Sequence, residues 1–120
     1  MRITIKYTNL DSTPAMDIFV RNKMNALVKF VQPLDKKGVA EAHLEVARIT
    51  KHHRKGQVFM AKCNLELPGK ILRAEHSDWN ARRCVDGVRS ELQQELKKYS
   101  AKFRPQDSRG QEQLRKLRGK

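Results

Sequence analysis

Four histidines are the side chains of this sequence best suited to acid–base or metal chemistry near neutral pH. His52 and His53 are adjacent, so their side chains diverge in an extended backbone, and His43 and His76 each stand alone, without a second histidine nearby. The sequence also shows no paired carboxylates, nucleophile elbow or phosphate-binding glycine loop. We therefore expect no enzyme, and we interpret the histidines as surface residues.

The two cysteines, Cys63 and Cys84, have no cysteine or histidine at zinc-finger spacing. In a chain that we expect in the cytoplasm, both should remain free thiols. We interpret them as small buried hydrophobic residues. The sequence thus predicts no metal, no cofactor and no small-molecule substrate.

Positive charge is the strongest chemical feature of the chain, because 26 Lys and Arg residues face 13 acidic residues among 120. Such an excess repels itself in a folded protein and favours a polyanionic partner, either nucleic acid or an anionic membrane. No apolar run approaches the roughly 20 residues that span a bilayer, and residues 1–5 resemble a strand rather than a signal peptide. We expect a cytoplasmic protein without a membrane partner.

One segment, residues 77–103, is predicted as a long amphipathic helix. Ser77 or Asp78 could cap its start, and no proline follows until Pro105. Its apolar residues recur at spacings of three and four and form one stripe. They are Val85, Val88, Leu92, Leu96, Tyr99 and Phe103. Because the strands need this stripe as a lid for the core, a membrane-surface role ranks low.

The polar faces of this helix differ from each other in charge. One flank gathers positive residues that the spacing leaves unpaired except for Asp86; they are Arg82, Arg83, Arg89 and Lys97. The opposite flank mixes signs, with Glu91, Glu95, Lys98 and Lys102. Such a pattern has two interpretations. The helix either presents an ordinary solvated surface, or its positive flank binds a polyanion.

The rest of the chain supplies strands and one more helix. Residues 2–8, 40–47, 59–67 and 70–75 alternate apolar and polar side chains and are predicted as strands. Thr13 and Pro14 begin a helix that Pro33 ends. Residues 51–56 form a basic hairpin connection, and Pro68-Gly69 is a turn.

This order predicts an α+β fold, a two-layer β-α-β-β-β-α sandwich with a four-stranded sheet and both helices on one face. We expect a core that includes Phe19, Leu27, Leu44, Phe59, Leu65, Val88, Leu92 and Leu96. Residues 1–103 should form the single folded domain. Residues 104–120 carry six basic and two acidic residues without apolar periodicity and are expected to be a flexible basic tail.

Three strings in this order resemble the family of ribosome hibernation-promoting factors, also described as ribosome-associated inhibitors or sigma-54 modulation proteins. They are TPAMDIFVRNKMNALVKF (13–30), NLELPG (64–69) and CVDGVRSELQQELKK (84–98). The resemblance covers about residues 2–102 and is to a short form, without the dimerisation domain of long members. It implies the same fold and binding to the small ribosomal subunit and its ribosomal RNA near the decoding region, across the paths of messenger and transfer RNA.

The resemblance also suggests which residues bind. Lys23, Lys29, Lys98 and Lys102 match positions that are usually basic in the family, whereas Ala26, Glu91 and Gln94 stand where relatives often carry Lys or Arg. The unpaired flank found from spacing supplies further cations. The predicted ribosomal-RNA-binding residues are Lys23, Lys29, Arg82, Arg83, Arg89, Lys97, Lys98 and Lys102.

The predicted function is therefore ribosome hibernation, with inhibition of translation under stress by a protein that is a monomer off the ribosome. The alternative is a general RNA-binding module that acts away from the ribosome, because phosphate neutralisation does not identify the polymer. Trp79, at the start of the long helix, is either a packing residue or a base-stacking residue. The sequence leaves both roles open.

Overall fold

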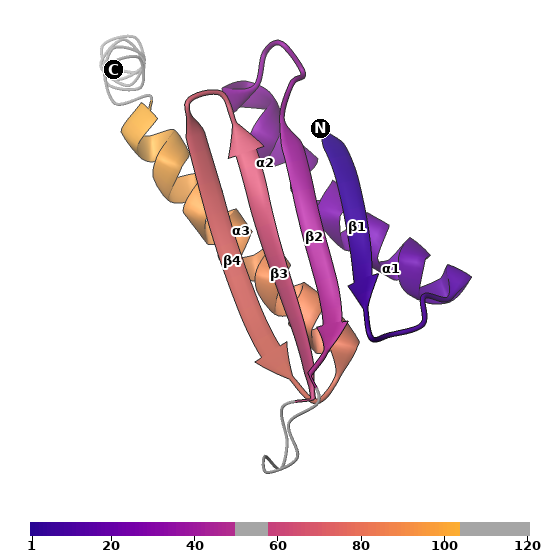
Figure 1. Cartoon of the computed structure of the whole chain (residues 1–120). Coiled ribbons are helices and arrows are strands. Elements are labelled where there is room, and N and C mark those ends of the chain that lie inside the picture. The colour runs from indigo at the N-terminus through magenta and orange to yellow at the C-terminus, as the bar shows by residue number, and fades with distance from the viewer. Residues whose placement is uncertain (50–57, 104–120) are drawn as a thin grey trace, which may run out of the picture.

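A computed structural model of the chain describes residues 1–49 and 58–103, as a four-stranded sheet with helices packed against it (Figure 1). The strands are β1 Arg2–Thr8, β2 Glu41–Arg48, β3 Phe59–Leu67 and β4 Lys70–Asp78. The helices are α1 Pro14–Asn25, the short α2 Val28–Val31 with the 3₁₀ helix η1 Gln32–Leu34, and α3 Ala81–Phe103. The predicted basic connection 51–56, with His52 and His53, and the predicted tail 104–120 lie outside the described residues.

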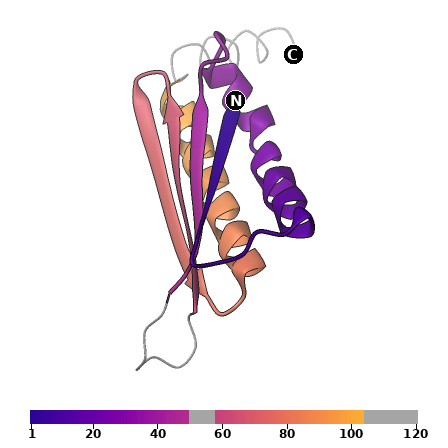
Figure 2. The same ribbon diagram turned by 45° about the vertical axis from the view of Figure 1, so that its right-hand side comes forward.

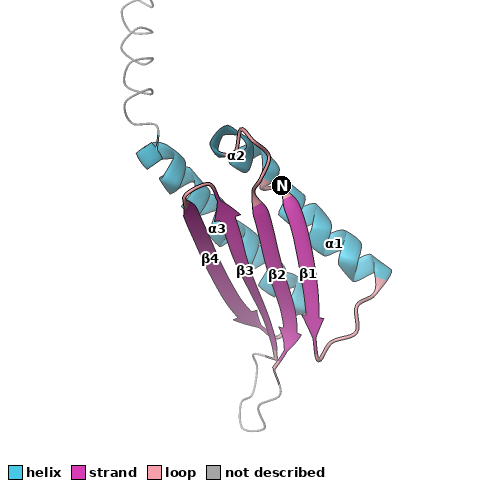
Figure 3. Cartoon of the chain, turned by 45° about the horizontal axis from the view of Figure 1, so that its top comes forward, coloured by secondary structure: helices cyan, strands magenta, loops and turns pink. Residues whose placement is uncertain are grey.

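The strands follow one another in space in the order β1-β2-β3-β4, with β1 parallel to β2 and the other pairs antiparallel. A parallel neighbour requires the chain to return to the other end of the sheet, and α1 and α2 make this crossover. Turned views show α1 and α3 side by side on the same face of the sheet (Figures 2 and 3). The predicted two-layer β-α-β-β-β-α sandwich is confirmed.

The core lies between the sheet and the helices. Six of the eight predicted core residues are at most 2% exposed: Leu27, Leu44, Leu65, Val88, Leu92 and Leu96. Phe19 and Phe59 are only partly buried. Each of these rings lies at the margin of the core, where an arginine guanidinium covers it: Arg48 at 5.9 Å from the Phe59 ring centre and Arg82 at 5.0 Å from that of Phe19.

The first helix begins as predicted but ends earlier. Thr13 caps it by accepting the backbone N–H of Met16 at 3.1 Å, and Pro14 is the first helical residue. The expected helix to Pro33 is wrong, because α1 ends at Asn25 and Pro33 lies inside η1. The N–H of Leu27 bonds the Met24 carbonyl, three residues back, which tightens the turn and redirects the chain.

The long helix begins later than predicted. Ser77 and Asp78 were expected to cap it, but they belong to β4 and pair with Met60 and Phe59. These ladder partners are far away in the sequence, so local spacing did not reveal that the strand continues past residue 75. Asn80 is the cap instead, and its Oδ1 accepts the backbone N–H of Arg82 at 2.9 Å.

Asp35 is the one charged side chain among the buried residues that the structure describes, at 7% exposure. Its carboxylate accepts the backbone N–H of Val39 at 2.9 Å and that of Ala40 at 2.7 Å, and so closes the loop before β2. We expect Asp35→Ala to lower the free energy of unfolding by about 1–3 kcal/mol, because buried donors lose their acceptor. Urea unfolding would measure this, with the exposed Asp11→Ala as control; equal stability of both variants would contradict it.

None of the helices in residues 1–49 and 58–103 is long and apolar enough to cross a membrane.

Candidate nucleic-acid interface

The two faces of the molecule carry different charge. The open face of the sheet is balanced, with basic Arg2, Lys6, Lys62 and Arg73 against acidic Glu41, Glu45, Glu66 and Glu75. By contrast, helices α1, α2 and α3 together carry nine basic and four acidic residues. The helix layer is therefore the side of this domain that attracts a polyanion.

Several of the charges on the open sheet face are also paired with each other. Arg2 Nη1 lies 3.5 Å from Glu41 Oε1, and Lys62 Nζ lies 4.0 Å from Glu45 Oε1. His43 Nε2 is 2.9 Å from Glu66 Oε2. Such exposed pairs contribute little stability, but they neutralise this face locally.

Across the helix layer, α1 and α2 meet α3 along a line of cations and aromatic rings that we call the helix seam. It consists of Phe19, Lys23, Lys29, Phe30, Arg82, Asp86, Arg89, Gln93 and Lys97. The α3 members recur every three or four residues, which places them on the flank that faces α1. This is the flank that spacing predicted as positive.

Two phenylalanine rings hold four of these cations in place. The Phe19 ring lies 5.5 Å from Lys23 Nζ and 5.0 Å from the Arg82 guanidinium, and one cation comes from each side of the helix seam. Attraction to the negative face of a ring offsets part of the repulsion between neighbouring cations.

Phe30 repeats this arrangement further along the helix seam. Its ring centre is 5.2 Å from Lys29 Nζ and 5.6 Å from Lys97 Nζ. In the part of the chain that the structure describes, Lys29, Lys97 and Arg82 form no ion pair, so their charge remains available to an anion.

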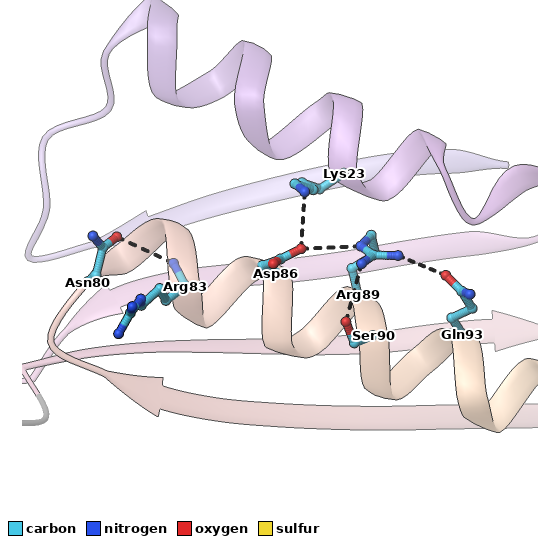
Figure 4. A network of polar contacts seen from close by, with 7 residues as sticks. All are labelled: Lys23, Asn80, Arg83, Asp86, Arg89, Ser90 and Gln93. Atoms are coloured by element: carbon cyan, nitrogen blue, oxygen red, sulfur yellow. Dashed lines mark hydrogen bonds and ion pairs between the residues drawn. The ribbon is translucent and has the colours of Figure 1, made fainter.

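Asp86 stands on α3 between Arg82 and Lys97 in the sequence, and Figure 4 shows it facing Lys23 of α1. Its Oδ1 is 3.1 Å from Lys23 Nζ on α1 and 3.4 Å from Arg89 Nε on α3. The hydrogen bond from Lys23, followed by the one from Arg89, lowers the pKa of Asp86. This carboxylate therefore ties α1 to α3.

Arg89 is not the unpaired cation that the helical spacing predicted. Besides Asp86, it donates to Gln93 Oε1 at 2.8 Å and to Ser90 Oγ at 3.2 Å, and its side chain is only 23% exposed (Figure 4). With its donors used inside the protein, Arg89 positions its neighbours more than it offers charge to a partner.

Asp86→Asn should lower the melting temperature at neutral pH, because the ionised carboxylate is stabilised in the folded state. A depressed pKa contributes stability that is present above the usual value of 3.8 and is lost as pH falls through the folded-state pKa. The melting temperatures of the variant and the unchanged protein should therefore converge in acid. A difference in melting temperature that persists well below pH 3.8 would contradict the stabilising role of the ionised Asp86 carboxylate.

The other predicted residues lie apart from the helix seam. Arg83 is exposed at the start of α3, and its side chain points away from α1 in Figure 4. Lys98 lies on the opposite flank, 71% exposed and 3.9 Å from Glu95. The side chain of Lys102 is outside the described residues. Sequence reasoning missed Phe19 and Phe30 as parts of the site, although Lys23 follows Phe19 by one helical turn and Lys29 directly precedes Phe30.

Both cysteines are buried, as expected. Burial raises the pKa of Cys63 to about 12 and that of Cys84 to about 11. At neutral pH both are thiols rather than thiolates, and thiols are poor nucleophiles and metal ligands. They act here as packing residues.

One group of side chains in the described ranges has the donor set for a metal ion: Glu41, His43 and Glu66, whose ligand atoms lie within 4.8 Å of one another. The group lies on the open sheet face, where Arg2 pairs with Glu41 and His43 pairs with Glu66. The charges of the two glutamates are therefore already compensated by contacts within the protein.

The chain is thus a two-layer α+β domain with a balanced sheet face and a cationic helix face. The chain belongs to the family described as Sigma 54 modulation protein / S30EA ribosomal protein, whose family model matches residues 3–104. This agrees with the resemblance seen in the sequence. No curated protein matches the chain.

Solved structures with this fold include two similar ones. The N-terminal domain of Protein Y from Thermus thermophilus is 22% identical with a TM-score of 0.63, over 82% of this chain and 99% of that one. A ribosomal subunit interface protein from Coxiella burnetii is 23% identical with a TM-score of 0.66, over 84% of this chain and 99% of that one. At this identity the likeness establishes the fold.

Proposed function

We propose that this protein binds the small ribosomal subunit through the helix seam and inhibits translation by occupying the paths of messenger and transfer RNA near the decoding region. Family membership supports the ribosome as partner, and one protein of similar structure is named for the subunit interface. The site-level part of the proposal rests on the charge and geometry of the helix seam.

The observation that carries the proposal is the contrast between the two faces. Ribosomal RNA is a dense array of phosphates, and binding cations release its counterions. Lys29, Arg82 and Lys97 are cations of the helix seam without an ion-pair partner among the described residues. They belong to a helix layer with nine basic and four acidic residues, whereas the open sheet face carries four of each. The helix side therefore gains more of this electrostatic free energy than the balanced sheet face does.

Inhibition by this route is a matter of occupancy. A bound protein that covers this RNA surface competes with messenger and transfer RNA. One protein molecule therefore inhibits one ribosome, and its dissociation restores translation by that ribosome. The proposed inhibition is stoichiometric and reversible, and ribosomal and messenger RNA stay intact.

Two measurements test the proposal. The protein should sediment with small subunits through a sucrose gradient at physiological salt, and it should compete there with initiator transfer RNA. In a cell-free bacterial translation reaction, synthesis should fall in proportion to the ribosomes occupied. Equal binding to small subunits and to unrelated structured RNA would favour a general RNA-binding module instead, and full occupancy together with transfer RNA at the peptidyl site would contradict the blocking mechanism.

A further inference from the structure

Trp79 is the most exposed large hydrophobic side chain that the structure describes, at 68%. The other aromatic side chains in this part of the chain are partly buried against the core: Tyr7, Phe19, Phe30, Phe59 and Tyr99. Trp79 therefore does not pack in the core. A planar apolar ring that is left in water is available to a partner.

The backbone on both sides of Trp79 is fixed. Asp78 pairs with Phe59 at the end of β4, and its Oδ1 accepts the backbone N–H of Asn80 at 3.2 Å. Asn80 in turn caps α3. The backbone of Trp79 is thus held between a strand and a helix. A partner can therefore bind the indole without the entropic cost of ordering a loop.

Two cations follow this position closely in the sequence. Arg82 and Arg83 come one helical turn after it, and both are exposed. The Arg82 guanidinium also lies 5.0 Å from the Phe19 ring, so Arg82 is positioned as part of the helix seam. Neither arginine forms an ion pair within the described ranges.

An exposed indole, followed within one helical turn of the chain by two arginines without ion-pair partners in the described residues, matches the chemistry of one nucleotide. We infer that Trp79 is a base-stacking residue: an unpaired base of RNA lies on the indole, while Arg82 and Arg83 neutralise the phosphates that flank it. An acidic protein surface would satisfy the arginines but would leave the ring without a planar partner. The inference rests on the proposed function and adds to it the kind of RNA that is recognised, a single-stranded or splayed-out nucleotide.

Trp79 is the single tryptophan of the chain, so its fluorescence reports directly on the site. The full-length protein is titrated with a single-stranded oligouridylate and with an abasic oligonucleotide of the same length and charge. Stacking should quench the indole with the oligouridylate and leave it unquenched with the abasic chain. Equal quenching by both would show that charge alone brings the polymer near, and would overturn the inference.

Substitutions give a second readout. Trp79→Ala should weaken oligouridylate binding about 5- to 150-fold, the range for loss of one stacked base, while Trp79→Phe retains most of the affinity. The dependence of affinity on salt should stay the same in Trp79→Ala, because no phosphate contact is removed. Ile71→Ala, at a 47% exposed position on the open sheet face, is the matched control. Unchanged affinity in Trp79→Ala, with a normal melting temperature, would overturn the inference.

The small subunit separates this inference from the proposed function. If the unchanged protein fails to bind small subunits, the proposed function fails, whereas the oligouridylate titration still reports on stacking. If Trp79→Ala loses small-subunit binding but binds oligouridylate like the unchanged protein, Trp79 contacts a ribosomal protein, and the stacking inference is wrong.

Discussion

Reversing the charge of Arg82 and Lys97 together should weaken binding to the small subunit about tenfold or more at physiological salt, and should flatten its salt dependence. Each phosphate contact contributes a slope of roughly 0.7 to 0.9 in a plot of log affinity against log salt, so the loss of two contacts lowers that slope by about 1.4 to 1.8. Both side chains lie over rings of the helix seam without an ion-pair partner in the described residues. Sedimentation binding at several salt concentrations measures both quantities.

The matched control is the double reversal of Lys6 and Arg73, which changes the net charge equally but on the open sheet face. It should leave the salt dependence nearly unchanged. Arg89 is unsuitable for this test, because Arg89→Glu would break the contacts with Asp86 and Gln93. If reversal of Lys98 and Lys102 abolishes binding while the Arg82 and Lys97 reversal leaves it intact, the opposite flank of α3 forms the interface.

Leu92→Ala should lower the free energy of unfolding by about 2–5 kcal/mol, because it removes a fully buried side chain and leaves a cavity. Leu92 lies in the middle of the α3 stripe that covers the sheet. Small domains have a total stability of about 5–15 kcal/mol, so the variant should lose a large share of it. Urea denaturation followed by circular dichroism measures the change.

A control for the cavity is Ile18→Ala on α1, where the side chain is 61% exposed. That variant should change stability by no more than about 0.5 kcal/mol. Equal losses for the two variants would mean that the α3 stripe does not carry the core. A change in the m value, the dependence of the unfolding free energy on urea, without a shift of the midpoint would instead indicate that the compactness of a state has changed.

Local patterns predicted most of the fold, because each strand buries alternate residues and each helix buries every third or fourth. Ile3 and Ile5 on β1 and Leu92 and Leu96 on α3 follow these periods. The errors occur where a residue distant in the sequence determines the secondary structure by pairing with the segment. Asp78 looked like a helix cap, yet it continues β4 because Phe59, nineteen positions earlier, pairs with it.

Prediction of the site was limited in the same way. The positive flank of α3 follows from residue spacing, whereas Arg89 was predicted to be unpaired although Asp86 stands at i,i+3 spacing from it and contacts it. That Lys23 also reaches Asp86, and that Phe19 and Phe30 lie under cations from both sides, depends on how α1 and α2 pack against α3. No periodicity within one helix contains that information.

The parallel pairing of β1 with β2 has a consequence for how the chain folds. Strands β3 and β4 join through a tight turn at Gly69, which has a positive φ of 76°, and α3 follows them directly, so these contacts close short loops. Ile5, by contrast, pairs with Leu44 across the whole crossover, and long-range contacts form late. We expect the strand that is synthesised first to be the last to dock, so that weakening the β1–β2 pairing accelerates unfolding far more than it slows folding.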